Sequence, residues 1–202
     1  MNRARPKQER SRQTRKQVLD AAAKAFADTG YKSTTVARIA ADADVTKGAL
    51  TFHFASKGDI ASAIVALFYE RWPPRIPEFR SAHPRALDTV WAILRELAVE
   101  FRDQTIVRAA TRLQAERDFI DVELPTPFVD WTSQLTALYT EAAEAGELRT
   151  GVVPEEIARV TVSAFYGAQE VSRTLHGRSD IVERIDELIL MLRLAADPDE
   201  PA

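Results

Sequence analysis

The stretch of sequence that decides the fold is residues 33–57, STTVARIAADADVTKGALTFHFASK. Its first part carries apolar residues at the spacing of one helix face: Val36, Ile39 and Ala40. The segment 42–44 interrupts this spacing, and Val45 follows as an apolar residue that can fill the corner. Thr46 can then cap a second helix, because its hydroxyl can accept a bond from a backbone N–H two or three residues later. The stretch therefore predicts two short helices joined by a tight turn.

The second of these helices has the residue distribution of a helix that lies in a DNA groove. We expect three of its apolar residues to turn inward: Ala49, Leu50 and Phe52. Polar and basic residues are left to face outward beside Gly48: Lys47, Thr51 and His53. In a helix-turn-helix the second helix enters the major groove with its N-terminal residues at the base edges. The alternative is an ordinary pair of core helices that binds nothing.

The distribution of charge favours the DNA-binding interpretation. The chain of 202 residues has a net charge of −3. Residues 1–57 carry 12 Lys and Arg against 5 Asp and Glu, whereas residues 58–202 carry 15 against 25. This asymmetry predicts two domains, a polyanion-binding segment 1–57 with a basic N-terminal arm and an acidic body 58–202. A solvated basic tail is the alternative, but here the basic segment runs directly into the helix-turn-helix.

The N-terminal segment supplies further basic residues. Residues 1–9 show no apolar periodicity, and we expect a disordered arm that orders along a phosphate backbone or in a minor groove. A helix is predicted over about 11–28 and ends at Gly30. The clustered cations at its start repel one another, which favours a polyanionic partner. The residues predicted to bind DNA are Arg12, Arg15, Thr34, Thr35, Thr46, Lys47, Gly48, Thr51, His53 and Lys57.

The remainder of the chain has helical periodicity and no strand-like alternation. Ser56 and Asp59 form a predicted capping box at the start of a helix that stops near Trp72. Further helices are predicted over about 84–102, 104–117, 128–146, 154–175 and 180–196, and the tail 197–202 is expected to fray. The fold class predicted is all-α, with a three-helix DNA-binding domain and a helical C-terminal domain for ligand binding and dimerisation.

Several classes of protein are excluded or disfavoured. The chain has no cysteine, so disulfides and thiolate chemistry are excluded. The histidines His53, His83 and His176 have no metal-ligand spacing, and no Gly-rich phosphate loop or nucleophile elbow is present. No apolar run approaches the roughly 18 residues of a membrane span. The sequence therefore predicts a cytoplasmic protein, associated with the nucleoid when bound to DNA, with no enzymatic activity, cofactor, metal or membrane contact.

The helix-turn-helix resembles that of the TetR family of bacterial transcription regulators. The matching residues are Thr35, Ile39, Ala40, Ala43, Val45, Thr46, Gly48, Leu50, His53, Phe54, Lys57 and Asp59. Asp44 replaces the glycine that is common in the turn, and Asp tolerates a left-handed backbone better than most residues. Thr51 replaces the usual Tyr; it can still hydrogen-bond a phosphate but offers less surface.

Within that family the chain resembles the γ-butyrolactone and furan autoregulator receptors. The resemblance rests on VTKGALTFHFASK and on the segments YERWP (69–73), RLQAERDFID (112–121) and ELPTPFVDW (123–131). It implies a repressor of antibiotic biosynthesis genes that leaves DNA when a small butyrolactone, butenolide or furan binds. It also implies a homodimer, built through the last two helices, that reads a palindromic operator. The alternative for those helices is burial within one subunit.

The same resemblance implies a set of ligand-binding residues. Trp131 would pack on the inducer, and Tyr69 and Gln114 would hydrogen-bond its oxygens. Phe128 departs from the Tyr found in related furan receptors, which favours a less polar ligand. The full set is Tyr69, Trp91, Arg112, Gln114, Phe128, Trp131 and Phe165. Two alternatives stay open: the aromatic residues form only a core, and Arg112 pairs with Glu116 one helical turn away.

Two other functions stay open at this stage. A regulator of the same fold could control an efflux or stress gene and sense an unrelated lipophilic compound. A constitutive DNA-binding protein would have a filled core and no inducer. For the inducible repressor, we expect the ligand to shift the helix that starts at Ser56 and so change the separation of the two recognition helices.

Overall fold

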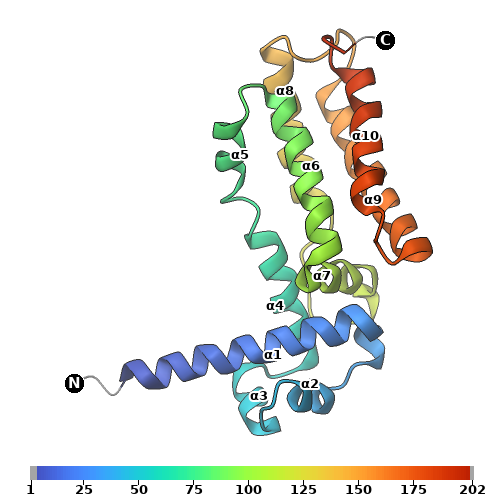
Figure 1. The fold of residues 1–202 in the computed structure, drawn as a ribbon. Coiled ribbons are helices and arrows are strands. Elements are labelled where there is room, and N and C mark those ends of the chain that lie inside the picture. The colour runs from blue at the N-terminus through green and yellow to red at the C-terminus, as the bar shows by residue number, and fades with distance from the viewer. Residues whose placement is uncertain (1–3, 201–202) are drawn as a thin grey trace. The chain divides into compact units, whose positions relative to one another are not determined.

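The computed structural model describes residues 4–200, and the side chains of residues 8–200. Within this range the chain is helical, with one 3-10 turn and no strand (Figure 1), which confirms the predicted all-α class. The elements are α1 (Ala4–Ser33), α2 (Val36–Asp42), α3 (Lys47–His53), α4 (Lys57–Glu70), α5 (Ile76–Ala82), α6 (Ala86–Asp103), α7 (Thr105–Ala115), η1 (Arg117–Phe119), α8 (Val129–Glu144), α9 (Pro154–His176) and α10 (Ile181–Ala196).

The start of α1 differs from the prediction. The helix begins at Ala4, so the expected disordered arm is wrong for residues 4–9; residues 1–3 lie outside the described residues. Pro6 stands in the first turn, where its missing N–H removes no intrahelical bond, and good helix formers follow it. At the other end, Gly30 has a non-helical backbone with φ of 82° and ψ of 176°, which confirms that the regular helix ends there. Two elements, α5 and η1, were not predicted.

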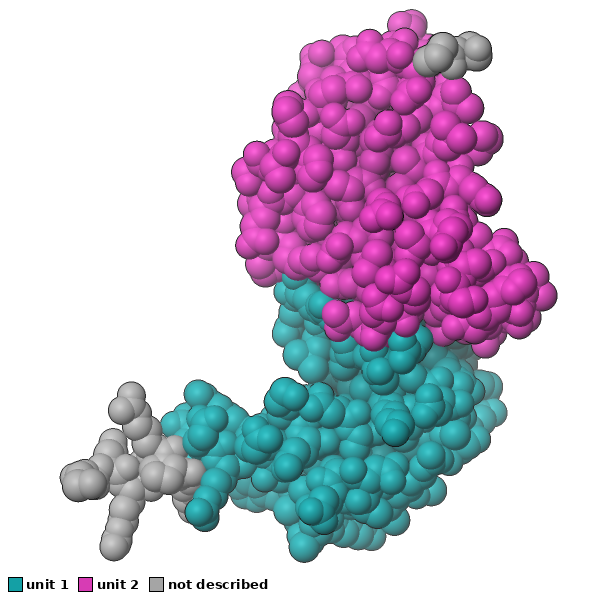
Figure 2. All heavy atoms as spheres, in the orientation of Figure 1, with its two compact units in different colours: residues 1–71, 105–125 teal, residues 72–104, 126–202 magenta. Residues whose placement is uncertain are grey.

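The described chain divides into two compact units, shown in Figure 2. We call residues 1–71 and 105–125 the head unit, and residues 72–104 and 126–202 the body unit. This division differs from the predicted boundary after residue 57, because α4 and α7 both pack against α1 and so belong to the head unit. Sequence periodicity could not show this packing, since α7 follows α1 by some 70 residues along the chain.

The helix-turn-helix lies in the head unit, where α2 and α3 pack on α1 and on each other (Figure 1). The caps of α3 and α4 are those that the sequence predicted. Thr46 Oγ1 accepts a 3.1 Å bond from the Ala49 N–H, and Thr35 caps α2 in the same way. Ser56 and Asp59 form the predicted capping box at the start of α4. The helix starts are therefore fixed by local side-chain chemistry.

The body unit is built from four long helices, α6, α8, α9 and α10, with α5 beside α6 (Figure 1). Its most buried large side chains are Leu87, Ile93, Phe101, Tyr139, Phe165 and Ile181. The Tyr139 hydroxyl is satisfied inside this core by a 2.9 Å hydrogen bond with Thr161 Oγ1, and burial raises the pKa of Tyr139. Among residues 4–200, no helix combines the length and hydropathy that a membrane crossing requires.

The C-terminal tail is held in place over residues 197–200, so the expected fraying is wrong there; residues 201–202 are not described. Asp197 is only 2% exposed and accepts a 2.8 Å bond from Arg85. Arg149 donates from its backbone N–H to Ala196 and from its guanidinium to the carbonyl of Asp197. Long-range contacts, which a local pattern does not reveal, hold this segment.

Candidate functional site

The outward face of α3 carries Lys47, Gly48, Thr51 and, against expectation, Phe52, all of them exposed. The predicted inward position of Phe52 is wrong, because its side chain is 80% exposed. Leu50 and Phe54 are buried instead, and a residue two positions from Leu50 lies on the opposite side of a helix. Sequence reasoning therefore missed the largest side chain on this surface.

Thr51 uses its hydroxyl within its own helix. Its Oγ1 lies 3.0 Å from the carbonyl of Lys47 and 3.1 Å from that of Gly48, and it donates toward them. Such bonds to a carbonyl in the preceding turn are common for helical threonine. The hydroxyl proton is thus engaged, so the side chain can offer a partner its γ-methyl and an oxygen that accepts but does not donate.

The turn before α3 depends on a left-handed residue. Asp44 has φ of 53°, as expected for the position where related sequences carry glycine. The backbone N–H of Asp44 donates to Ala41, and that of Val45 donates to Ala40, so the turn is hydrogen-bonded. The departure at this position therefore leaves the turn intact.

Gly48 is a glycine that the protein itself does not require. A Cβ added there would meet only Thr46 Oγ1, at 3.9 Å. Glycine inside a helix is unfavourable by roughly 1 kcal/mol relative to alanine. Since no neighbour in the described chain accounts for this residue, the space beside it is suited to the close approach of a partner.

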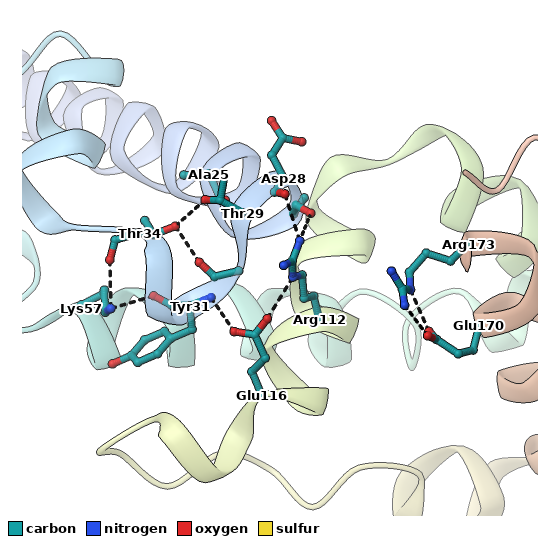
Figure 3. Close-up of polar contacts among 12 residues, drawn as sticks. Ala25, Asp28, Thr29, Tyr31, Thr34, Lys57, Arg112, Glu116, Glu170 and Arg173 are labelled. Atoms are coloured by element: carbon teal, nitrogen blue, oxygen red, sulfur yellow. Dashed lines mark hydrogen bonds and ion pairs between the residues drawn. The ribbon is translucent and has the colours of Figure 1, made fainter. Parts of the chain in front are cut away.

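Two residues predicted to bind DNA are bonded instead to residues 27–35, the end of α1 and the turn into α2, which we call the α1–α2 link (Figure 3). Thr34 is buried, and its hydroxyl donates a 2.7 Å bond to the carbonyl of Gly30. The Lys57 ammonium donates to the carbonyls of Tyr31, at 2.7 Å, and Thr34, at 2.9 Å. It also lies 4.0 Å from the centre of the Tyr31 ring. Both side chains hold the link between the helices, a role that depends on contacts the local sequence does not show.

The protonation of this link reflects its partial burial. Burial lowers the pKa of Lys57, against the opposing effect of the carboxylates of Asp121 and Glu116. Burial also raises the pKa of Tyr31, with Asp121 and Asp59 acting in the same direction. The raised pKa keeps the Tyr31 phenol protonated near neutral pH.

Arg112 of α7 and Glu116, which follows it, also hydrogen-bond this link (Figure 3). Arg112 Nη1 donates bonds of 3.0 Å to the carbonyls of Ala27 and Asp28, in the turn of α1 just before Gly30. Its Nε donates to Glu116 Oε1 at 3.0 Å, and Glu116 Oε2 accepts a 2.7 Å bond from the Tyr31 N–H. The open alternative for Arg112, a pair with Glu116, is thus the arrangement found. We call Arg112 and Glu116 the α7 clamp.

The α7 clamp leaves no room for a side chain at Gly30. A Cβ there would lie 2.9 Å from Arg112 Nη2 and closer still to Glu116 Oε1, and the φ of Gly30 is 82°. A side chain at Gly30 would therefore strain the backbone and would also force the ends of the clamp side chains to move out of their hydrogen bonds.

The other predicted DNA-binding residues are accessible to a partner. Arg12 and Arg15 are exposed on α1, and the Arg15 guanidinium lies 5.1 Å from the centre of the Phe54 ring. Thr35 and Thr46 are exposed as caps, whereas His53 is half-buried and its ring meets that of Phe52 edge to face. The surface of the head unit thus keeps eight of the ten predicted residues.

Tyr69 and Gln114, both predicted to bind ligand, lie together within the head unit. Gln114 Nε2 donates to Tyr69 Oη at 3.4 Å and to the carbonyl of Pro125 at 2.9 Å. Gln114 Oε1 is buried and has no partner within residues 4–200. Gln114 is two positions from both Arg112 and Glu116, so it lies on the face of α7 opposite the α7 clamp. The helix therefore carries a candidate ligand contact on one side and a contact to the α1–α2 link on the other.

The predicted aromatic ligand residues of the body unit fall into three groups. Trp131 packs edge to face on Trp72, with ring centres 5.2 Å apart. Trp91 meets Tyr139 at 6.3 Å. The third group contains Phe128, which is 42% exposed, and Phe165, which is buried; Tyr166, which was not predicted, contacts both, at 4.6 Å and 5.9 Å. Within the described residues the buried indole N–H groups of Trp72 and Trp91 have no acceptor.

Helices α9 and α10 expose apolar side chains that their own chain does not cover. On α9, Val160, Val171 and Leu175 fall on one face and are at least 44% exposed. On α10, Leu190 and Met191 are exposed, whereas Ile181, Ile185, Ile189 and Leu192 are buried within the body unit. These four residues recur at helical spacing and serve the core, and other residues form the outer surface of α10.

Comparison with known proteins identifies the family of this chain. A family model for bacterial regulatory proteins of the tetR family matches residues 18–64. A structure solved to explain the molecular basis for control of antibiotic production by a bacterial hormone is 45% identical, with a TM-score of 0.86 over 91% of this chain and 97% of that chain. The chain belongs to the TetR family. It is therefore a helix-turn-helix regulator of transcription, and this family is not one of enzymes.

Two further relatives narrow the resemblance within the TetR family. The A-factor receptor protein of Streptomyces griseus is 34% identical over 182 residues, which is 90% of this chain and 63% of that protein. The chain thus spans less than two thirds of the length of that relative. The TetR family protein CprB of Streptomyces coelicolor, solved in complex with its biological operator sequence, is 28% identical, with a TM-score of 0.83 over 94% of this chain and 91% of that chain.

Proposed function

We propose that this TetR-family protein is a dimeric repressor that binds a palindromic operator and leaves it when a small signalling molecule binds. The proposed inducer is of the butyrolactone, butenolide or furan type, and the proposed targets are antibiotic biosynthesis genes. The observation that carries the proposal is the exposed outward face of α3 in a chain that is 45% identical to a protein of hormone-controlled antibiotic production. The protein would act in the cytoplasm, associated with the nucleoid while on DNA.

The proposed DNA contacts are those predicted residues that remain accessible. They are Arg12, Arg15, Thr35, Thr46, Lys47, Gly48, Thr51 and His53. We expect the cations on α1 to contact phosphates and α3 to contact base edges in the major groove. Thr34 and Lys57 are assigned to the α1–α2 link instead, because their polar groups are already bonded there.

Unsatisfied buried polar atoms support the proposed inducer contacts. A buried polar atom without a hydrogen bond is unfavourable by about 1–3 kcal/mol, and a ligand can remove that penalty. In the body unit, the indole N–H groups of Trp72 and Trp91 suit an acceptor such as a lactone or carboxyl oxygen. In the head unit, Gln114 Oε1 suits a donor such as a hydroxyl. Trp131 would supply the apolar contact.

The exposed apolar side chains of α9 and α10 support the proposed dimer. Leucine, valine and methionine side chains gathered on helix faces are typical of a surface that a second protein surface covers. A two-fold dimer would bury the same residues from both copies and fix two recognition helices for two half-sites.

Release would require the inducer to prefer the DNA-incompetent conformation. We propose that the inducer moves α4, which begins at Ser56, and α7, whose Gln114 and α7 clamp lie on opposite sides of one helix. Since Lys57 on α4 and the clamp on α7 both bond the α1–α2 link, either movement reaches the helix-turn-helix.

An operator-release assay against a panel of butyrolactones, butenolides and furans tests this function. We expect one class to release the protein from DNA, and that class to bind more weakly when operator is present. Equal affinity for the compound with and without operator would contradict the release mechanism. Release only by unrelated lipophiles would assign the protein to the efflux or stress regulators, and release by nothing would indicate a constitutive DNA-binding protein.

The salt dependence of binding tests the role of Lys47. If its ammonium meets a phosphate, Lys47→Ala should weaken binding to all duplexes and reduce the slope of log K against log salt by about one. An unchanged slope would remove Lys47 from phosphate contact.

A further inference from the structure

Two neighbouring exposed residues of α3, Thr51 and Phe52, carry apolar groups. Phe52 is 80% exposed, the highest value among the large exposed hydrophobic side chains of the described chain. Beside it, Thr51 directs its hydroxyl proton to the carbonyls of its own helix, 3.0 and 3.1 Å away, so it has no proton left for a base and its γ-methyl is the apolar group available. A ring and a methyl group thus lie next to each other on the face proposed to enter DNA.

This pair is not explained by the protein's own packing. Phe52 contacts the His53 ring edge to face, with ring centres 5.3 Å apart, but most of its surface stays in water. Leu50 and Phe54 already supply the apolar contacts between α3 and the head unit. An exposed phenylalanine is unfavourable in water, and contact with another apolar group removes that penalty.

The major groove offers one apolar group, the C5-methyl of thymine. The phenylalanine ring and the methyl group of threonine are among the protein groups that contact it. Resting on the proposed operator binding, we propose that Phe52 and the γ-methyl of Thr51 recognise thymine methyl groups at fixed positions in each half-site. This pair would distinguish A·T pairs by shape and apolar contact, which no phosphate contact can do.

Removal of single methyl groups from the DNA tests the proposal directly. A duplex is first enriched from a random pool with the wild-type protein, and each thymine is then replaced in turn by deoxyuridine, which lacks only the methyl. Wild-type protein should lose affinity about fourfold at one or two thymines per half-site, the value for one buried methyl group. The other thymines should be insensitive.

Variants of the protein assign the effect to its residues. F52A should bind the unmodified duplex more weakly and should no longer distinguish thymine from deoxyuridine at the sensitive position. At Thr51, T51V keeps a γ-methyl and should keep the discrimination, whereas T51S keeps the hydroxyl and should lose it. F119A removes an exposed phenylalanine elsewhere in the head unit and serves as the matched control, with unchanged discrimination. Equal melting temperatures exclude unfolding as the cause.

The outcomes separate this inference from the proposed function. Tight binding to the enriched duplex with no deoxyuridine effect, or an effect that persists in F52A and T51S alike, overturns the methyl contact and leaves operator binding in place. Failure to enrich any duplex overturns operator binding, and the methyl contact with it.

Discussion

Two glycines in the head unit occupy opposite situations. Gly30 has a left-handed backbone, and an added Cβ would lie 2.9 Å from Arg112 Nη2. Gly48 has an ordinary helical backbone, and the nearest atom to an added Cβ is 3.9 Å away. The first glycine is explained by the protein's own structure. The second is not, so its explanation must lie in what α3 meets outside the protein.

The two glycines mark two kinds of residue in the head unit: those that stabilise its fold and those that are available to bind DNA. Around Gly30, the α7 clamp, Lys57 and Thr34 bond five backbone carbonyls and the Tyr31 N–H. On the outward face of α3, exposed side chains make few bonds within the chain. Substitutions in the first region should therefore change stability, and those in the second should change DNA binding.

The largest effect is expected at Gly30. Gly30→Ala adds a Cβ in a left-handed conformation and against the α7 clamp, so the free energy of unfolding should fall by about 2–4 kcal/mol. Denaturant unfolding measures it. Gly146→Ala is the matched control, because Gly146 has φ of 74° and nothing within 4 Å of the added atom, so only the backbone strain of about 1–2 kcal/mol applies. Equal losses in both variants would show that the clamp exerts no steric constraint.

A smaller effect is expected at Glu116. Glu116→Ala leaves the Tyr31 N–H and Arg112 without their carboxylate, so stability should fall by about 1–3 kcal/mol and operator affinity should fall with it. Glu170→Ala is the control, since the exposed Glu170–Arg173 pair should contribute at most about 1 kcal/mol (Figure 3). An operator affinity equal to that of the wild type would contradict a role for the α7 clamp in holding the helix-turn-helix.

Gly48 should show the opposite sign. Gly48→Ala raises helix propensity without a clash, so the free energy of unfolding should rise by about 1 kcal/mol. Operator affinity should fall, because the added methyl group occupies space that we assign to DNA. Thermal unfolding and a binding titration on the same preparation measure both changes. Unchanged affinity would show that DNA does not approach Gly48 closely.

The smallest effect is expected at Asp44. Its backbone is left-handed, with φ of 53°, but its side chain is exposed. Asp44→Gly relieves the backbone strain but loses more chain entropy on folding, so stability should change by less than about 0.5 kcal/mol. If the free energy of unfolding rose by more than about 1 kcal/mol, the left-handed backbone at Asp44 would be strained even though no neighbouring atom crowds it.

The sequence predicted well where a feature depends on neighbours in the chain. The caps at Thr46 and Ser56, the left-handed Asp44 and the helix end at Gly30 each depend on residues within one turn. These are short-range effects with strong residue preferences, and so they are visible in one sequence.

The differences from the prediction have two physical origins. Lys57 and Thr34 were predicted to contact DNA, and Arg112 was left open between a ligand and Glu116. Each bonds the α1–α2 link, in the case of Arg112 across 85 residues of sequence. Phe52 was placed inward because it is apolar, although its helical position faces away from Leu50. Polar residues can thus be structural and an apolar residue can be functional, and residue type alone does not distinguish them.

The open space beside Gly48 also bears on how this protein would change under selection. A population selected only for resistance to heat should replace Gly48 early, since alanine costs nothing inside the chain, and should never replace Gly30. A population that must also repress its operator should keep both. The persistence of glycine at position 48 in descendants would thus record DNA binding, even in lineages whose ligand has changed.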